Sequence, residues 1–573
     1  MRNRPRAAAD RRVLFAGLAI AGAAIAAYAR TFSVPFVFDD TLAIAENPTI
    51  RHLGPPWAVL FPPHGQGLTV EGRPILNLSF ALNYAISGTG VWSYHATNLL
   101  IHILAGLTLF GIARGTLGIK RGTGFQPMFS TEHGLEAHAT FPAFVTALIW
   151  TLHPLQTESV TYLSQRAESL MGLFYLLTLY GFIRDADESE SGKREAVGGN
   201  AGRGRRSRFS LSAFRFPLFS VAACLLGMAT KEVMVSAPLV VLLYDRTFVS
   251  GSFRAAWRAR RRYYLALAGT WLLLLILAGG AGSRGRTAGF GLGASFPAYA
   301  LTQFEAIAHY LRLAVWPRPL IFDYGAQWVR RPSAVLGDAV LVVGLMAATG
   351  WLLVAKTRIL RALGFAGASF FLILAPTSFV PLIRQTIAEH RMYLPLAAVV
   401  AVLVGALYRF AGRTAGSILG VAAAAACLGL TVQRNEDYRT RVALYRDTAA
   451  KRPDNVLAHY NLGMALAEAG RRGEAAAEFE AALRLEPQFP QADYNLGNAL
   501  AGAGRVAEAA DAYTAALRIN PNYAEAHRAL GEVLLRLGRN REARWHFNAA
   551  VLLHPDDTAA RRRRDQLDAM PQK

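Results

Sequence analysis

Cysteine is almost absent from this sequence of 573 residues, which has only Cys224 and Cys427, both inside apolar runs. Two such cysteines cannot build a disulfide framework, and they provide no cysteine-based metal site. Charged residues are also scarce, at 17%, whereas hydrophobic residues make up 53%. Soluble domains carry more charge than this, so the composition indicates a chain that crosses a membrane several times.

Several chemical motifs are missing as well. No group of His, Cys and Asp residues has the spacing of a zinc site, and no GxGxxG or Walker phosphate loop occurs at a strand-to-helix turn. A serine-hydrolase elbow is also lacking. These absences argue against nucleotide-driven chemistry, so any activated donor is expected to be carried by a lipid.

Acidic residues are outnumbered, with 39 Asp and Glu against 61 Lys and Arg, and the net charge is +22. From Val432 to Lys573 there are 21 basic and 19 acidic residues, an excess of only +2. The other +20 therefore belongs to the rest of the chain, where it gathers in short loops, as in the cytoplasmic loops of membrane proteins. A nucleic-acid groove would need a continuous basic face, so nucleic acid is not an expected partner.

Eleven apolar segments predict that residues 1–431 form an all-α transmembrane bundle of about eleven spans. The segments are residues 13–29, 96–113, 139–153, 168–183, 216–229, 233–245, 263–280, 336–355, 363–382, 394–408 and 414–431. Residues 299–316 are apolar too, but Glu305, His309 and Arg312 recur there at helical spacing. We therefore expect an amphipathic surface helix at 299–316 and not a further span.

The basic residues indicate the orientation of this bundle. With the N-terminus inside, the inside loops hold 27 Lys and Arg in 98 residues, whereas the outside loops hold 13 in 149. The inside loops are residues 1–12, 114–138, 184–215, 246–262, 356–362 and 409–413. This asymmetry has the sign of the positive-inside rule. The alternative for the first segment is a cleaved signal peptide, because Ala27-Tyr28-Ala29 resembles a cleavage site.

The short loops and the Arg-rich composition suggest a bacterial chain. We therefore expect an integral protein of a bacterial inner membrane, with a cytoplasmic N-terminus. An odd number of spans then makes the C-terminal region periplasmic.

Residues 436–573 contain a repeat with a period of 34 residues. Asn461-Leu462-Gly463 recurs as Asn495-Leu496-Gly497 and as Ala529-Leu530-Gly531. Other residues that keep the step are Tyr445, Phe479, Tyr513 and Phe547, and Pro453, Pro487, Pro521 and Pro555. This pattern is typical of tetratricopeptide repeats. We expect a half repeat at 439–454 and full repeats at about 455–488, 489–522 and 523–556, which form an α-solenoid suited to an extended peptide or a partner protein.

The first outer loop, residues 30–95, contains an acidic doublet, Asp39 and Asp40, just beyond the first span. A carboxylate at this position can accept the proton of a hydroxyl group that attacks a sugar. It can also stabilise the positive charge that develops at the anomeric carbon. The same doublet can instead cap a short helix that starts near Thr41, and the residues alone do not separate the two interpretations.

Polar residues also mark the outer ends of other spans. Arg166, Lys231 and Arg391 are candidates to hold a donor phosphate, although basic residues at span ends also extend to lipid headgroups. His102 is a further candidate inside the second span, where a lone histidine is more often an inter-helix contact. The remaining candidates for substrate binding are Arg73, His153, Glu158, Glu168, Glu232, Glu389, His390 and Tyr393.

Taken in order, these motifs resemble the family of transmembrane and tetratricopeptide repeat-containing O-mannosyltransferases. The motifs are Phe36-Val37-Phe38-Asp39-Asp40 with Ile44 and Asn47-Pro48, Arg73-Pro74, Leu82-Asn83-Tyr84, His95-Ala96-Thr97-Asn98 with His102, His153-Pro154 through Val160, Gln165-Arg166-Ala167-Glu168, Lys231-Glu232, Tyr244-Asp245 and Glu389 through Pro395. Gln165 departs from the small residue that the family more often has there.

The resemblance implies a class C glycosyltransferase fold with its active site on the non-cytoplasmic side. It also implies a polyprenyl-phosphate sugar donor and a catalytic aspartate in the first outer loop, which corresponds to Asp39 or Asp40. Mannose as the sugar is part of the same implication.

We therefore expect a membrane glycosyltransferase that moves a sugar, mannose by resemblance, from a polyprenyl-phosphate donor to Ser or Thr of a protein recruited by the repeats. The alternative is a non-enzymatic, membrane-anchored repeat scaffold for envelope protein assembly. A lipid or glycan transporter would need charges buried within the spans, whereas the charges here lie at span ends. No metal-binding residue is predicted, and a need for a divalent metal is left open.

Overall fold

The computed structural model describes residues 4–61, 70–118, 135–198, 215–280, 296–326, 328–380 and 385–569. These residues fold almost entirely into helices, and no strand occurs among them. They divide into two compact units, which we call the membrane unit and the repeat unit. The membrane unit comprises Met1–Leu320 and Ala326–Arg439, and the repeat unit comprises Ile321–Gly325 and Thr440–Lys573.

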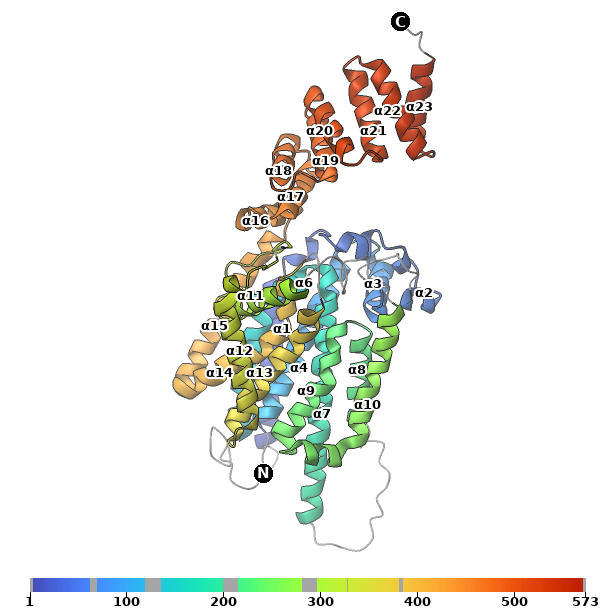
Figure 1. Cartoon of the computed structure of the whole chain (residues 1–573). Helices are drawn as coiled ribbons and strands as arrows, with labels where there is room; N and C mark the ends of the chain where they lie inside the picture. The colour runs from blue at the N-terminus through green and yellow to red at the C-terminus, as the bar shows by residue number, and fades with distance from the viewer. Residues whose placement is uncertain are drawn as a thin grey trace. The chain divides into compact units, whose positions relative to one another are not determined.

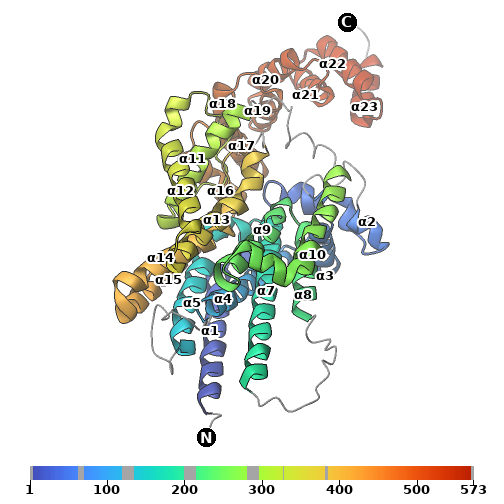
Figure 2. The same ribbon diagram turned by 60° about the horizontal axis from the view of Figure 1, so that its bottom comes forward.

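The membrane unit is a bundle of helices (Figures 1 and 2). Its helices are α1 (Arg4–Tyr28), α2 (Pro56–Leu60), α3 (Pro74–Ser87), α4 (Trp92–Leu117), α5 (Leu135–Leu152), α6 (Thr157–Thr161), α7 (Arg166–Gly198), α8 (Arg215–Met228), α9 (Ala237–Tyr244), α10 (Phe253–Gly280), α11 (Phe296–Val315), α12 (Leu336–Val354), α13 (Arg358–Phe379), α14 (Pro395–Phe410) and α15 (Gly412–Asp437). The short helical turns are η1 (Thr31–Ser33), η2 (Thr41–Ala45), η3 (Pro48–Ile50), η4 (Pro154–Gln156), η5 (Leu163–Gln165), η7 (Glu232–Ser236), η8 (Asp245–Val249), η10 (Pro332–Val335) and η11 (Glu389–Met392).

Each of the eleven predicted apolar segments falls on a helix of this unit, with η7 and α9 together carrying the sixth. Five stretches are long and apolar enough to cross a membrane: Asp10–Tyr28, Trp92–Leu117, Pro332–Val354, Arg358–Phe379 and Gly412–Asp437. Three further apolar helices are shorter: Ala139–Leu152, Arg215–Met228 and Pro395–Phe410. The unit is therefore a polytopic helical bundle, and the count of eleven spans stays a prediction.

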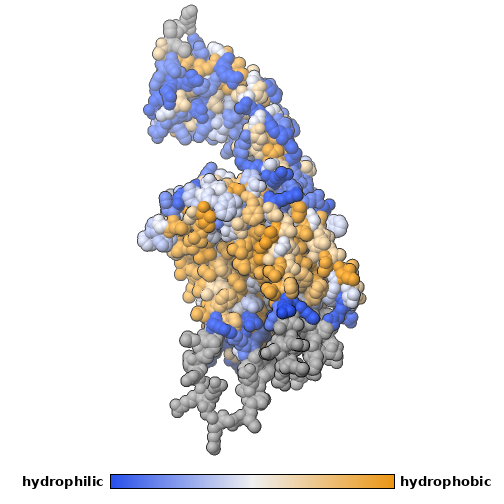
Figure 3. All heavy atoms as spheres, turned by 180° about the vertical axis from the view of Figure 1, so that it is seen from behind, coloured by the Kyte–Doolittle hydropathy of each residue, from blue (hydrophilic) through white to orange (hydrophobic). Residues whose placement is uncertain are grey.

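The surface of the membrane unit agrees with this architecture. Figure 3 shows a broad hydrophobic band on one face, with hydrophilic residues at both of its ends. Residues 299–316, expected as an amphipathic helix, form α11 almost in full. This helix buries Tyr299, Ala306, Tyr310 and Leu313 on one side.

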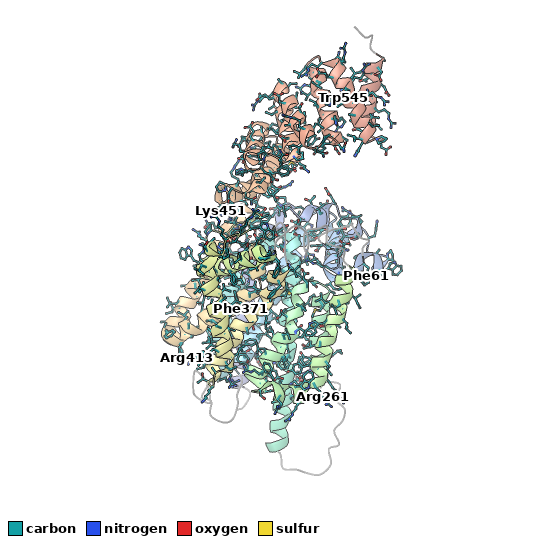
Figure 4. The ribbon with its side chains drawn as sticks, in the orientation of Figure 1. Phe61, Arg261, Phe371, Arg413, Lys451 and Trp545 are labelled. Atoms are coloured by element: carbon teal, nitrogen blue, oxygen red, sulfur yellow. The ribbon has the colours of Figure 1, made fainter. Side chains whose placement is uncertain are left out.

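The two ends of the bundle differ in what they contain. α2, α3, α6 and α11 lie at one end, and the chain begins at the other (Figure 1). Arg261 and Arg413, from two of the basic loops, lie at the end where the chain begins, and Phe61 lies at the opposite end (Figure 4). We call the end with α3 and α6 the outer end and the other the inner end, after the sides that the basic residues predict.

The centre of the bundle is packed with small residues where α1, α5 and α15 meet. Ala24 of α1, Ala143 and Ala147 of α5 and Ala424 of α15 are buried in one cluster. Small side chains allow helix axes to approach closely inside a membrane, where packing and not exclusion of water holds helices together. This core fixes the helix ends from which the outer turns start.

The repeat unit is a row of antiparallel helix pairs. Its helices are α16 (Arg441–Lys451), α17 (Val456–Glu468), α18 (Arg472–Leu485), α19 (Pro490–Gly502), α20 (Val506–Ile519), α21 (Ala524–Arg536), α22 (Asn540–Leu553) and α23 (Thr558–Asp568). The turn inside each full pair contains a glycine with positive φ, namely Gly470, Gly504 and Gly538. Glycine adopts this conformation without steric cost, which explains its recurrence every 34 residues.

A second glycine in each repeat sits under an aromatic ring. A Cβ atom on Gly497 would lie 2.5 Å from Cε1 of Tyr513, and Gly463 and Gly531 face Phe479 and Phe547 in the same way. The ring can pack directly on the backbone of the partner helix only if no side chain intervenes. The repeat period in the sequence therefore reflects this contact, which occurs once in each repeat.

The repeat unit also contains a short segment from the connection between α11 and α12. Asn455 caps α17 by accepting from Leu457 N–H and Ala458 N–H, and its Nδ2 donates to the carbonyl of Asp323 (2.9 Å). Phe322 packs edge-on against Tyr445. Residues 321–325 thus belong to the core of the repeat unit, an association that the sequence pattern did not predict.

Replacing Gly497 with alanine tests the contact between glycine and ring. The added methyl group must displace Tyr513, so we expect a loss of about 1–3 kcal/mol of stability. Hydrogen exchange of the α19 and α20 amides in the full chain measures it. Gly473→Ala is the matched control, because nothing lies within 4 Å of its Cβ position. Equal protection in the two variants would contradict the packing account.

Candidate active site at the outer end

The acidic doublet lies in a tight turn directly before η2. Phe38, the residue before the doublet, has φ of +47°, a backbone conformation that is unusual for a bulky residue. The turn is closed by Asp40 N–H donating to the Val37 carbonyl (3.0 Å) and by Val37 N–H donating to Oδ2 of Asp40 (3.1 Å). Such strain persists only where surrounding contacts compensate for it, and it occurs often at functional sites.

The two aspartates have different surroundings. Asp40 is fully buried, and its Oδ1 accepts from Ser164 N–H (2.6 Å). Burial raises the pKa of Asp40 to about 7, and the two backbone N–H donors act against that rise. Asp39 is half-buried, and its N–H donates to the hydroxyl of buried Tyr162 (3.1 Å). Asp40 therefore holds the turn, and Asp39 is the more accessible carboxylate.

Arg166 starts α7 and is fully buried. Its guanidinium donates to Asn98 Oδ1 (2.6 Å), Asn83 Oδ1 (2.7 Å), the Tyr94 carbonyl (2.9 Å) and both the carbonyl and Oγ of Ser79 (3.1 Å each). Phe80 covers its face at 4.6 Å. These contacts use every nitrogen of the guanidinium, and they join α3, α4 and α7. The expectation that Arg166 binds a donor phosphate stays a prediction.

Lys231 and Glu168 form a buried ion pair. Lys231 Nζ donates to Glu168 Oε1 at 2.5 Å, and the two side chains are only 8% and 4% exposed. Burial lowers the pKa of Lys231, and the negative charge of Glu168 acts against that shift. A buried charge of this kind is costly unless it is paired or used, and Glu168 is the partner that Lys231 has here.

A second pair lies beside the first and is more exposed. Nη2 of Arg73, the residue before α3, lies 3.3 Å from each carboxylate oxygen of Glu232. The side chain of Glu232 is 34% exposed. The positive charge of Arg73 also acts on Lys231, so Arg73 and Lys231 form one cationic region balanced by two glutamates.

Glu158 of α6 contacts η11 through His390. The N–H of His390 donates to Glu158 Oε2 (2.9 Å), and Nδ1 of the same histidine lies 2.7 Å from Oε1. Burial raises the pKa of Glu158 to about 8. Burial and the charge of Lys231 lower the pKa of His390 to about 3. Both shifts favour the neutral forms, so a proton on Glu158 is shared with His390 Nδ1.

Arg391 follows His390 and lines a small cavity. Its guanidinium donates to the carbonyls of Thr386 (3.1 Å) and Gln385 (2.7 Å). The cavity is lined by Glu168, Met171, Val233, Ile373, Thr377, Arg391, Leu394 and Pro395. A cation and an anion thus meet at a mostly apolar cavity between α7, η7, α13 and α14.

One short segment joins the acidic doublet to the charged pairs. Ser164 of η5, which binds Asp40, and Glu168 in the first turn of α7, which binds Lys231, lie four residues apart. The doublet and the cationic groups therefore lie at the same end of the bundle, although they come from distant parts of the sequence. Among the described residues, no group of three or more His, Cys, Asp or Glu side chains is arranged to hold a metal ion.

Comparison with known proteins gives matches for both units. Tetratricopeptide repeat models match residues 428–488, 468–524 and 500–566. The human protein O-mannosyl-transferase TMTC1 is 25% identical over 533 residues, which cover 82% of this chain and 55% of the human protein. Mouse protein O-mannosyl-transferase TMTC4 is 26% identical over 507 residues, which cover 80% of this chain and 65% of the mouse protein.

Over most of its length this chain is similar to the TMTC protein O-mannosyl-transferases. The resemblance predicted from the motifs is thereby confirmed, as is the tetratricopeptide character of the C-terminal repeats. The chain spans a little over half of the human relative and about two thirds of the mouse one. Among solved structures, ArnT from Cupriavidus metallidurans bound to undecaprenyl phosphate is 17% identical over 89% of this chain and 80% of that chain, with a TM-score of 0.36.

Three of the predicted substrate-binding residues of this chain hold helices together. His102 Nε2 faces the Thr151 carbonyl (2.9 Å), and because a carbonyl only accepts, Nδ1 must accept from the Tyr393 hydroxyl (3.0 Å). His153 likewise donates to the Ala314 carbonyl (3.2 Å). The carbonyl of Tyr393 accepts from the Trp150 indole (3.0 Å). His102 is therefore the satisfied inter-helix contact that was its alternative interpretation. Glu389 is also buried.

Two asparagines of the first outer loop also have structural roles. Asn47 Nδ2 donates to the Ala43 carbonyl (2.9 Å) and to Asn77 Oδ1 (3.2 Å). Asn77 in turn donates to the Val59 carbonyl (2.7 Å).

The sequence did not point to Tyr162 and Ser164, whose groups position the acidic doublet. Their place just before the Gln165-Arg166 motif was the one available signal.

Substituting Glu158 tests the neutral pair with His390. Glu158→Gln keeps an acceptor for His390 N–H and a donor for Nδ1, so we expect thermal unfolding near that of the unchanged protein. Glu158→Ala leaves both groups without a partner and should cost about 1–3 kcal/mol. A folded-state pKa near 8 for Glu158, against an ordinary 4.5, lowers stability as pH rises between these values. The pKa of His390, lowered from 6.5 to about 3, acts in the opposite sense up to pH 6.5, so the net fall in stability is expected between pH 6.5 and 8. Glu158→Gln should flatten that slope, and an unchanged slope would argue against a neutral Glu158.

Arg166→Lys tests the structural role of that arginine. An ammonium group has three donors and cannot reach all the acceptors around the guanidinium, so we expect a loss of about 2–5 kcal/mol in thermal unfolding. Arg330→Lys, at an exposed position, is the control. A variant that unfolds normally but binds donor lipid poorly would support the phosphate-binding interpretation.

Proposed function

We propose that this chain is a membrane glycosyltransferase that transfers a sugar, mannose, from a polyprenyl-phosphate donor to a Ser or Thr hydroxyl of a protein. The reaction takes place at the outer end of the membrane unit, on the non-cytoplasmic side of a bacterial inner membrane. The names of the relatives support mannose and a protein acceptor. The lack of any nucleotide-binding motif supports a lipid-borne donor.

The observation that carries the proposal is the half-buried Asp39 in a strained turn held by Asp40 and Tyr162. We assign Asp39 as the general base. Its carboxylate accepts the proton of the acceptor hydroxyl as that oxygen bonds to the anomeric carbon. The bond between the anomeric carbon and the phosphate oxygen breaks, and the electron pair leaves with the lipid phosphate. Asp40 acts as a positioning residue, because both of its oxygens bind backbone N–H groups.

The leaving phosphate needs positive charge nearby. Lys231, Arg73 and Arg391 lie together at the same end of the bundle, and their charges act on the shared neighbour His390. We assign the donor phosphate to this cationic region, which adjoins the cavity between α7 and α13. Glu168 and Glu232 balance the cations before the donor binds, so the site carries no large net charge when empty.

The repeat unit is assigned to acceptor recruitment. Tyr460 and Tyr494 occupy the same position in successive repeats, and they pack against Phe489 (4.8 Å) and Tyr523 (5.1 Å). Asn495 donates to the Tyr460 hydroxyl (2.9 Å). A row of aromatic rings and amides along α17 and α19 suits an extended peptide, whose backbone offers both hydrogen-bonding groups and apolar surface.

The hydrophobic band and the basic loops favour an inner-membrane location with the N-terminus in the cytoplasm. Arg261 and Arg413 at the inner end illustrate this charge distribution (Figure 4). The orientation leaves the acidic doublet on the side opposite the cytoplasm, where a lipid-linked sugar is presented to exported proteins.

Exchanging each aspartate for asparagine separates their roles. Asp39→Asn should lower sugar transfer from polyprenyl-phosphate mannose by roughly 10²–10⁴-fold with unchanged thermal unfolding, because the general base is lost. Asp40→Asn places an amide N–H₂ against a backbone N–H and should lower the unfolding temperature. Transfer is followed in membranes by mass spectrometry of the protein acceptor.

The result also distinguishes the scaffold alternative. Full transfer by Asp39→Asn would remove the catalytic assignment. If the unchanged protein transfers no sugar and the proteins that it captures carry none, the chain is a membrane-anchored scaffold for envelope proteins.

A further inference from the structure

Two arginines lie close together at the inner end, far along the chain from the candidate active site. Arg246 lies in η8, and Arg361 lies in the first turn of α13. The two elements pack together: Phe248 of η8 contacts Phe365 of α13 at 5.2 Å. Arg358 Nη2 also donates to the carbonyl of Phe248 (2.9 Å). η8 and α13 therefore hold two positive charges in one place.

Both guanidinium groups have buried N–H donors without an acceptor. Nη1 of Arg246 and Nε of Arg361 are buried and make no hydrogen bond within the described part of the chain. Arg246 packs over the ring of Phe253 (5.4 Å), and no ion pair of either arginine occurs among the described residues. A buried donor that lacks an acceptor is costly, so the protein alone leaves this pair incomplete.

The carboxylate next to Arg246 in the sequence is already used. Asp245 precedes Arg246, but it accepts from Ser250 Oγ (2.6 Å), from Arg260 Nη1 (3.0 Å) and from the Tyr264 hydroxyl. Arg260 also lies 3.9 Å from Asp185. Burial lowers the pKa of Arg246, and the positive charge of Arg361 lowers it further. An anion from outside the chain can neutralise these two positive charges and accept from their unused N–H donors.

The surroundings favour a lipid as the source of that anion. Phe253, Trp257 and Ile359 are large apolar side chains near this pair in the sequence, and each is about half exposed. A site where arginine donors adjoin exposed aromatic and aliphatic groups at the end of a hydrophobic band matches the boundary between lipid headgroups and acyl chains. Arginine binds phosphate oxygens in a bidentate manner.

We propose that Arg246 and Arg361 form a binding site for the phosphate of an anionic phospholipid headgroup at the inner end of the membrane unit. The phosphodiester oxygens accept from the unused N–H groups of η8 and α13. The lipid thereby joins the end of α9 to the start of α13 and neutralises both charges. This site is independent of the proposed transfer reaction.

Lipid-dependent unfolding of the purified full chain tests the proposal. Phosphatidylglycerol should raise the unfolding temperature in neutral detergent more than phosphatidylethanolamine does, and native mass spectrometry should show retained phosphatidylglycerol. The double variant R246Q/R361Q should weaken that binding by on the order of tenfold or more. Without lipid it should unfold no earlier than the unchanged chain, because two unsatisfied charges have been removed.

The matched control is R258Q/R261Q, which removes the same charge from exposed positions on α10. It should keep the phosphatidylglycerol effect. Equal loss in the two double variants would overturn the site in favour of general surface attraction. If inorganic phosphate alone stabilised the chain as strongly as the lipid does, the lipid occupant would be wrong. Should R246Q/R361Q fail to fold, the single variant R361Q repeats the lipid comparison.

Discussion

The outer end of this protein depends on one buried carboxylate. Asp40 binds Val37 N–H in its own turn and Ser164 N–H in η5, just before α7. The first contact closes the turn that contains the strained Phe38, and the second attaches this turn to the bundle. A strained backbone persists only when its surroundings hold it, so the position of Asp39 follows from the contacts of Asp40. The proposed base is thus placed by its neighbour.

Buried charged groups at the two ends of the membrane unit differ in whether they have partners. At the outer end, Lys231 is paired with Glu168, Glu158 with His390, and Arg166 with amide and carbonyl oxygens. Buried charge is tolerated when each ion has a partner with good geometry, and these pairs balance the buried charges of the outer end. At the inner end, Arg246 and Arg361 have donors that no group of the described chain satisfies. The membrane itself is a source of the missing anion.

Much of the fold could be predicted because its signals are local. The apolar segments fall on helices, and the 34-residue period reflects the contact of Gly463, Gly497 and Gly531 with a ring in the same repeat. The residues of the candidate site were predicted with less success than the fold. Sequence position pointed to Asp39, Asp40, Lys231 and Glu158 among others. It also pointed to Arg166, His102 and His153, which the structure uses to connect helices. A polar residue at the end of a span gives the same sequence pattern whether it binds substrate or connects helices.

By itself, the sequence determined the helical membrane bundle, the repeat unit and the resemblance to O-mannosyltransferases, because hydrophobic length, repeat period and motif order are properties of the linear sequence. Only the tertiary structure decided which aspartate is accessible and which cation is already bound. It also decided that residues 321–325 belong to the repeat unit. Those features depend on hydrogen bonds between residues far apart in the sequence, such as Glu158 and His390, which are separated by 232 positions. A hydrogen bond depends on distance in space, which sequence spacing does not give.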